Sequence, residues 1–112
     1  MAFNATLETS KGIAKITLSG ELDASSAPIF KTEVEKAVAE HPKRLVLMMQ
    51  NLEYMASAGL RVLIFAKQKM GADKDIYMVG PTEMVMETLN KTGFDQSVIV
   101  VDEYDAAQIE NV

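Results

Sequence analysis

The segment LEYMASAGLRVLI, residues 52–64, decides the fold because it joins a predicted buried strand to a predicted helix. Residues 45–49, just before it, are all apolar, which is typical of a strand covered on both faces in a parallel sheet. Residues 58–70 show helical spacing and are followed by Gly71, a favoured residue at helix C-termini. Ser57 therefore stands at the carboxyl end of a central strand, where open α/β sheets usually place their sites.

The chain before this segment predicts a hairpin and one helix. Strands are expected over residues 3–8 and 13–19, and the short polar turn between them favours antiparallel pairing. A helix follows, which Ser25 or Ser26 can cap and which Pro42 ends. Helical spacing places its predicted inner residues on one face: Phe30, Val34, Ala37, Val38 and His41.

The chain after residue 70 continues the alternation of strands and helices. We expect a strand at residues 76–79, a helix capped by Thr82 and closed by Gly93, a strand at 98–101 and a short helix at 104–109. This order predicts an α/β fold in a single domain over residues 1–112. Its sheet is mixed and mostly parallel after the initial hairpin, with helices packed against it.

Length and composition favour one globular domain in the cytoplasm. The chain has 112 residues, of which 48% are hydrophobic, enough for a single core. No apolar run approaches the roughly 20 residues that span a bilayer. The N-terminus lacks the basic and then apolar pattern of a signal peptide, and the lack of cysteine agrees with a cytoplasmic location.

Charge and residue types argue against two further classes of function. A net charge of −5 disfavours non-specific nucleic-acid binding, which needs clustered Lys and Arg. With no Cys and one His, a transition-metal site is not expected. A magnesium or calcium site made of carboxylates alone would need an Asp-rich loop, which the sequence does not contain. We therefore expect no metal and no cofactor.

Ser57 allows three interpretations. As a helix cap, its hydroxyl would accept a hydrogen bond from a first-turn N–H, which contributes about 1 kcal/mol. As a nucleophile it would need a base, but the only histidine falls on the predicted inner face of the preceding helix, and the segment lacks the first glycine of G-x-S-x-G. As a phosphoacceptor it would gain about −1.5 to −2 charges at a helix N-terminus, which favours anions. The residues alone do not select among these.

The helix that follows Ser57 carries an aromatic residue among polar ones. Phe65 projects between Arg61, Gln68 and Lys69 on the predicted outer face. An aromatic side chain in such surroundings is typical of an interaction surface. The alternative is that a neighbouring helix covers it.

Two motifs resemble signatures of a known family. Residues 52–63 look like the signature of STAS domains in the anti-sigma factor antagonist family of bacteria. Ser19-Gly20-Glu21-Leu22-Asp23, followed by an amphipathic helix, resembles the family's other signature at the end of its second strand. The order of elements fits over essentially the whole chain, including residues 92–94 after the third major helix.

The resemblance implies a protein-binding switch and not an enzyme. The serine that matches Ser57 is phosphorylated in the family by a partner that is both an ATP-dependent kinase and an anti-sigma factor. The unmodified form binds that partner and frees the sigma factor, and a PP2C-type phosphatase restores the unmodified form. For this chain we therefore expect these two protein partners, no nucleic acid, no membrane, and a monomer or weak dimer.

Partner contacts in the family involve the loop after the second strand and the start of the helix. Asp23 matches a position near the acceptor serine. The predicted partner-binding residues are Asp23, Ser25, Ala56, Gly59, Leu60, Arg61 and Phe65.

Two departures from the family keep a second hypothesis open. Many members have an acidic residue in place of Ala56, and many have Asp-Leu-Ser where this chain has Met48-Met49-Gln50. The lost carboxylate removes negative charge beside the hydroxyl, so kinase recognition could differ from that of a typical member. The alternative is a scaffold or ligand-sensing interaction module that is never phosphorylated.

Overall fold

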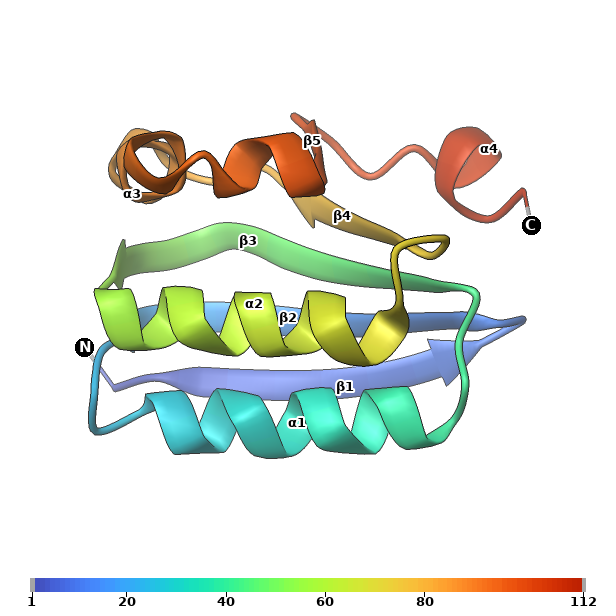
Figure 1. Ribbon diagram of the computed structural model, residues 1–112, viewed down its shortest axis with the longest axis horizontal. Coiled ribbons are helices and arrows are strands. Elements are labelled where there is room, and N and C mark those ends of the chain that lie inside the picture. Colours follow the sequence, from blue (N-terminus) through green and yellow to red (C-terminus); the bar gives the residue numbers. More distant parts are fainter. Residues whose placement is uncertain (1, 112) are drawn as a thin grey trace.

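A five-stranded sheet with the strands in sequence order lies at the centre of the computed structural model, which describes residues 2–111 (Figure 1). Strands β1 and β2 are antiparallel, and β2 to β5 are mutually parallel. The strands are β1 Asn4–Ser10, β2 Ile13–Leu22, β3 Arg44–Met55, β4 Asp75–Val79 and β5 Ile99–Val101. The helices are α1 Ala27–Ala39, α2 Ser57–Met70, α3 Glu83–Thr92, the 3₁₀ helix η1 Phe94–Ser97, and α4 Ala106–Ile109. The predicted fold class is thereby confirmed.

The two faces of the sheet carry cores of different size. The larger core lies under α1, α2 and α3, and in Figure 1 both α1 and α2 cross in front of the sheet. Alternate residues along a strand point to opposite faces, so Leu45 and Leu47 enter this core while Val46 enters a smaller one behind the sheet. The smaller core contains Ile109 of α4 and Tyr77 of β4.

Strand β3 is longer than the sequence predicts. The predicted strand ends at residue 49, but β3 continues to Met55 along β2. Two register shifts, one between Thr17 and Ser19 and one between Gly20 and Glu21 of β2, insert extra residues into β3. Strand β4 pairs with β3 only as far as Met48. The second half of β3 is therefore paired with β2 alone, and a single residue separates it from α2.

His41 does not lie on the inner face of α1, contrary to the prediction. The helix ends at Ala39, and His41 follows it as an exposed residue with a positive φ of 51°. The backbone N–H of His41 donates to the carbonyl of Val38, which closes the helix and turns the chain towards Pro42.

The C-terminal segment is attached to the back of the sheet by one arginine and one isoleucine. The Arg44 guanidinium donates to the carbonyls of Gln108 and Ile109 at 2.6 and 2.9 Å. The Ile109 side chain is fully buried in the smaller core. Within residues 2–111, no helix combines the length and the apolar character that crossing a membrane requires.

We expect Ile109→Ala to lower the free energy of unfolding by about 2–5 kcal/mol, because it leaves a cavity in the smaller core. Urea denaturation followed by circular dichroism measures the change. Ile29→Ala is the matched control, since Ile29 is 50% exposed and the same truncation there should cost within about 0.5 kcal/mol. Equal losses in the two variants would contradict the proposed attachment of the C-terminal segment.

Candidate functional site

The carboxyl ends of β2 and β3 bring two segments of the predicted site together. Leu22 and Met55, the last residues of these strands, are register partners. One residue further on, the backbone N–H of Ala56 donates to the carbonyl of Leu22 at 2.8 Å. The loop after β2 and the first turn of α2 therefore start side by side at this end of the sheet.

Ser57 is the first residue of α2 and not its cap. The N-cap position belongs to Ala56, which has extended backbone angles and accepts bonds from the N–H groups of Gly59 and Leu60 at 3.0 and 3.3 Å. The Ser57 side chain is exposed, and its hydroxyl makes no hydrogen bond to any of residues 2–111. The cap interpretation is therefore wrong, and the hydroxyl is directed to solvent.

Gly59 allows α2 to begin directly on the end of β2. A Cβ atom at this position would lie 2.7 Å from Leu22 Cδ2 and 2.9 Å from Met55 Cγ. Both neighbours belong to the large core, so neither can move away freely. Gly59 itself is buried, and Leu60 is only 6% exposed. These two predicted partner-binding residues are thus packed in the core beneath the first turn of α2, and they expose little surface that a partner could contact.

A single carboxylate oxygen organises the loop after β2. Asp23 Oδ1 accepts from the backbone N–H groups of Ser25 and Ser26 at 3.0 and 3.1 Å, and from the Ser25 hydroxyl at 2.7 Å. Hydrogen bonding, first of all from the Ser25 hydroxyl, holds the pKa of Asp23 below its ordinary value. Ser26 occupies the N-cap position of α1, but its side chain makes no capping bond, so the predicted cap by Ser25 or Ser26 is not formed. The Asp23 carboxylate bonds instead to the loop that precedes the helix.

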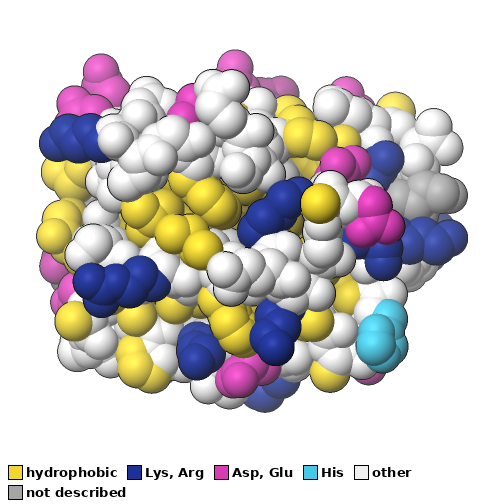
Figure 2. All heavy atoms as spheres, in the orientation of Figure 1, with side chains coloured by type: hydrophobic (Ala, Val, Ile, Leu, Met, Phe, Trp, Pro, Cys, Tyr) yellow, Lys and Arg dark blue, Asp and Glu magenta, His cyan; other side chains and the backbone are white. Residues whose placement is uncertain are grey.

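The outer face of α2 is basic and partly apolar. Arg61 is exposed, whereas Phe65 is half-buried against the large core. The ammonium groups of Lys31 in α1 and Lys69 in α2 lie 4.9 and 5.7 Å from the centre of the Phe65 ring. A side chain of α1 thus lies over the ring, as the alternative interpretation expects, while the ring stays only half-buried. Figure 2 shows Lys and Arg side chains spread across this face of the molecule.

Some residues near the site carry no clear signal in the sequence. Ile29, in the first turn of α1, is 50% exposed, and Tyr54, two residues before Ala56, is 40% exposed. Tyr54 follows a bulge, and its direction cannot be derived from simple alternation. Ala56, the predicted neighbour of the acceptor, is half-buried.

His41 cannot serve as a general base for Ser57. His41 follows the C-terminal end of α1, which lies at the opposite end of the domain from the start of α2 (Figure 1). Among residues 2–111 there is also no group of three His, Cys, Asp or Glu side chains placed to hold a metal ion. His41 is therefore not placed to act as a base for Ser57.

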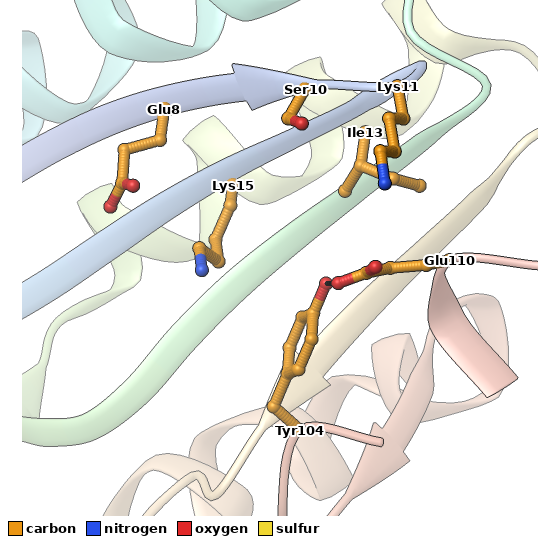
Figure 3. A pocket seen from close by; sticks show the side chains of 7 residues that line it. All are labelled: Glu8, Ser10, Lys11, Ile13, Lys15, Tyr104 and Glu110. Carbon is orange, nitrogen blue, oxygen red and sulfur yellow. Dashed lines mark hydrogen bonds between the residues drawn. The ribbon is translucent and has the colours of Figure 1, made fainter. Parts of the chain in front are cut away.

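A cavity of about 210 Å³ lies near the turn between β1 and β2, at the other end of the sheet from Ser57 (Figure 3). The Tyr104 hydroxyl donates to Glu110 at 2.6 Å, and Lys15 Nζ lies 5.1 Å from the centre of the Tyr104 ring. Desolvation, together with this bond and the charge of Glu110, raises the pKa of Tyr104 to about 12. The cavity is lined by Glu8, Ser10, Lys11, Ile13, Lys15, Tyr104 and Glu110.

Replacing Gly59 by alanine should lower the free energy of unfolding by about 1–3 kcal/mol, because the new methyl group overlaps Leu22 and Met55. The matched control is Gly93→Ala: a Cβ at Gly93 meets nothing within 4 Å, although the positive φ of 76° adds strain. NMR chemical shifts should change at the ends of β2 and β3 for Gly59→Ala and stay unchanged there for Gly93→Ala. Unshifted signals from Leu22 and Met55 in the Gly59 variant would contradict the close approach.

The pKa of Asp23 should rise in Ser25→Ala, because the Ser25 hydroxyl is the largest cause of its depression below 3.8. A group with a lowered folded-state pKa stabilises the fold above its unfolded pKa, and this contribution is lost as the pH falls through the folded value. NMR titration of the side-chain carboxyl carbon measures the midpoint. Ser97→Ala, a distant exposed serine, serves as the control, and an equal midpoint in all three proteins would refute the assignment.

Comparison with known proteins identifies relatives of this arrangement. The STAS domain family matches residues 4–107. The anti-sigma-F factor antagonist RsfB of Mycobacterium tuberculosis is 23% identical over 96 residues, which are 86% of this chain and 79% of RsfB.

Two solved structures share the fold. An anti-sigma factor antagonist from Mycobacterium paratuberculosis superposes with a TM-score of 0.85 at 24% identity, covering 96% of this chain and 92% of the other. The anti-sigma factor antagonist SpoIIAA in its unphosphorylated form gives a TM-score of 0.78 at 17% identity, covering 96% and 94%. Because the family match extends over nearly the whole chain, this protein belongs to the STAS domain family.

Proposed function

We propose that the protein is a bacterial anti-sigma factor antagonist that acts by exchanging partners in the cytoplasm. Its unmodified form binds an anti-sigma factor with serine kinase activity, and the sigma factor is released. The kinase then transfers the γ-phosphoryl group of ATP to the Ser57 oxygen, ADP leaves, and the phosphorylated form no longer binds. A PP2C-type phosphatase hydrolyses the phosphoester and regenerates the unmodified form.

The exposure of Ser57 is the observation that carries this proposal. Its hydroxyl lies at the solvent-facing start of a helix and makes no hydrogen bond to residues 2–111, so a kinase can reach it without opening the fold. The relatives support the same activity, since RsfB is named an anti-sigma-F factor antagonist. SpoIIAA has been solved in a phosphorylated form as well, and that structure gives a TM-score of 0.71 with this chain.

Elementary electrostatics explains how a phosphate at Ser57 would act. A phosphoserine adds about −1.5 to −2 charges, and the N–H groups in the first turn of a helix attract negative charge. The folded chain would therefore tolerate the group. The Asp23 carboxylate stays ionised at neutral pH in the adjoining loop, so the added charge would make this end of the surface strongly negative. The added negative charge would therefore alter the binding of the partner and leave the packing of the core unchanged.

The remaining predicted residues have two kinds of role in this proposal. Asp23, Ser25, Ala56, Arg61 and Phe65 contribute to the surface that the partner contacts. Gly59 and Leu60 are buried and fix the position of that surface by packing the first turn of α2 against the core. The chain itself catalyses no step, its domain extends over residues 1–112, and it works as a monomer or weak dimer.

A second candidate function is supported by the cavity at the other end of the sheet. Lys11, Lys15 and Tyr104 line a cavity of about 210 Å³ there, which suits a ligand-sensing module that is never phosphorylated. A scaffold or sensor of this kind would self-associate or bind a small molecule without any change at Ser57. Light scattering after size-exclusion chromatography separates a stable oligomer from a monomer or weak dimer.

Incubation with ATP and the purified kinase-type anti-sigma factors of the same organism should place one phosphate on Ser57, located by mass spectrometry. Ser57→Ala should accept none and still bind the partner, while Ser57→Asp should bind more weakly in calorimetry because of its charge. Ser97→Ala, the control, should be phosphorylated like the wild type. The proposal fails if Ser57 stays unmodified and Ser57→Ala behaves like the wild type in every assay.

A further inference from the structure

We propose that the outer face of α2 docks on an acidic, partly apolar surface of the anti-sigma partner. Arg61, Lys31 and Lys69 would supply the positive charge, and Ile64 would make the central apolar contact. This inference rests on the proposed function and specifies the chemistry of the partner.

The spacing of exposed residues defines this face. Ser57, Arg61, Ile64 and Gln68 follow one another at intervals of four, three and four residues, which places them on one side of a helix. All four are exposed, and Ile64 is 40% exposed although its side chain is large and apolar. The docking face therefore begins at the candidate phosphoacceptor and continues along α2.

The charges on this face lack carboxylate partners. Among residues 2–111, no carboxylate forms an ion pair with Arg61, Lys31 or Lys69, and the two lysines flank the Phe65 ring instead. Lys67 is different, because its ammonium group donates to the carbonyl of Lys74 at 2.8 Å. Three cations thus remain available on one surface.

The distribution of charge along the chain makes this surface distinctive. Helix α2 contains three basic residues and no acidic one, although the whole chain has a net charge of −5. Residues 83–110 contain seven acidic residues and one basic residue. The molecule is therefore polarised, and an acidic partner is attracted to α2 and repelled from residues 83–110.

A protein surface fits this face better than a membrane or a nucleic acid. Binding to anionic lipids through basic residues usually takes clusters of about 4–8 Lys or Arg, and here only three are free. Ile64 is a single exposed aliphatic residue on this face, and Arg61 lies beside it. An apolar centre with a charged rim is typical of protein interfaces. Arginine is also enriched among the residues that contribute most to such interfaces.

The position of Ser57 at one end of this face gives the switch a physical basis. An acidic partner surface that approaches α2 would meet a phosphate on Ser57 as a like charge. The same phosphate lies one helical turn from Arg61 and would partly neutralise it. Phosphorylation would thus remove attraction and add repulsion on the surface that binds.

Charge reversal on α2 tests the inference against the purified kinase-type anti-sigma factors of the same organism. Arg61→Glu should raise the Kd about tenfold or more, and raising the salt concentration should weaken wild-type binding. The matched control is Lys91→Glu on α3, which changes the net charge equally and should shift the Kd by no more than about twofold. Thermal melting of each variant verifies that it is folded.

The apolar contact has its own pair of variants. Ile64→Ser should weaken binding about tenfold, because a side chain in the centre of an interface would be lost. Val100→Ser is the control, since Val100 is 37% exposed on β5, away from α2. Equal effects of Arg61→Glu and Lys91→Glu, or of the two serine variants, would overturn the assigned surface while leaving the proposed function intact.

A photo-crosslinking amino acid in place of Gln68 tests the chemistry of the partner directly. Mass spectrometry of the cross-linked complex should locate the attachment among Asp and Glu residues of the anti-sigma factor, and attachment to a basic surface would overturn the inference. Vesicles containing phosphatidylserine should not bind the protein, and binding that Arg61→Glu abolishes would assign the face to lipid instead. If no anti-sigma factor binds at all, the proposed function fails together with this inference.

Discussion

The close contact between Gly59 and the end of β2 is the constraint on which the rest of the site depends. Without a side chain at this position, the first turn of α2 lies directly on Leu22 and Met55. The bond from the Ala56 N–H to the Leu22 carbonyl fixes the same approach through the backbone. Because strand pairing and one glycine place Ser57 beside the Asp23 loop, the arrangement depends on few side-chain identities. A relative with only 24% identity accordingly keeps the fold with a TM-score of 0.85.

The order and type of the main elements could be predicted because most segments have a consistent period. Even-numbered residues of β2 are buried and odd-numbered ones are half-exposed over most of its length, and this alternation is visible in the sequence. The second half of β3 could not be predicted. Its bulges break the alternation, so Gln50, Asn51 and Glu53 have the appearance of a loop although they belong to a strand.

The location of the candidate site was predicted better than its bonding. Ser57 is where the spacing placed it, but a serine at a helix start suggests a cap, and only the length of β3 shows that Ala56 holds that position. The hydrogen bonds to Asp23 depend on the shape of a loop, which residue type alone does not determine. His41 was misplaced because helical periodicity does not reveal that the helix ends at Ala39, where the chain turns before Pro42.

The C-terminal segment also covers an apolar surface on the back of the sheet. Ile109 covers Ile13, Val46, Tyr77 and Val79 on the back of the sheet, and Arg44 holds it there through two carbonyls. A chain shortened before this residue would expose a row of apolar side chains on an open sheet, a surface on which molecules aggregate. Proteolytic trimming of these last residues would therefore reduce solubility while leaving Ser57, at the opposite end of the sheet, in place.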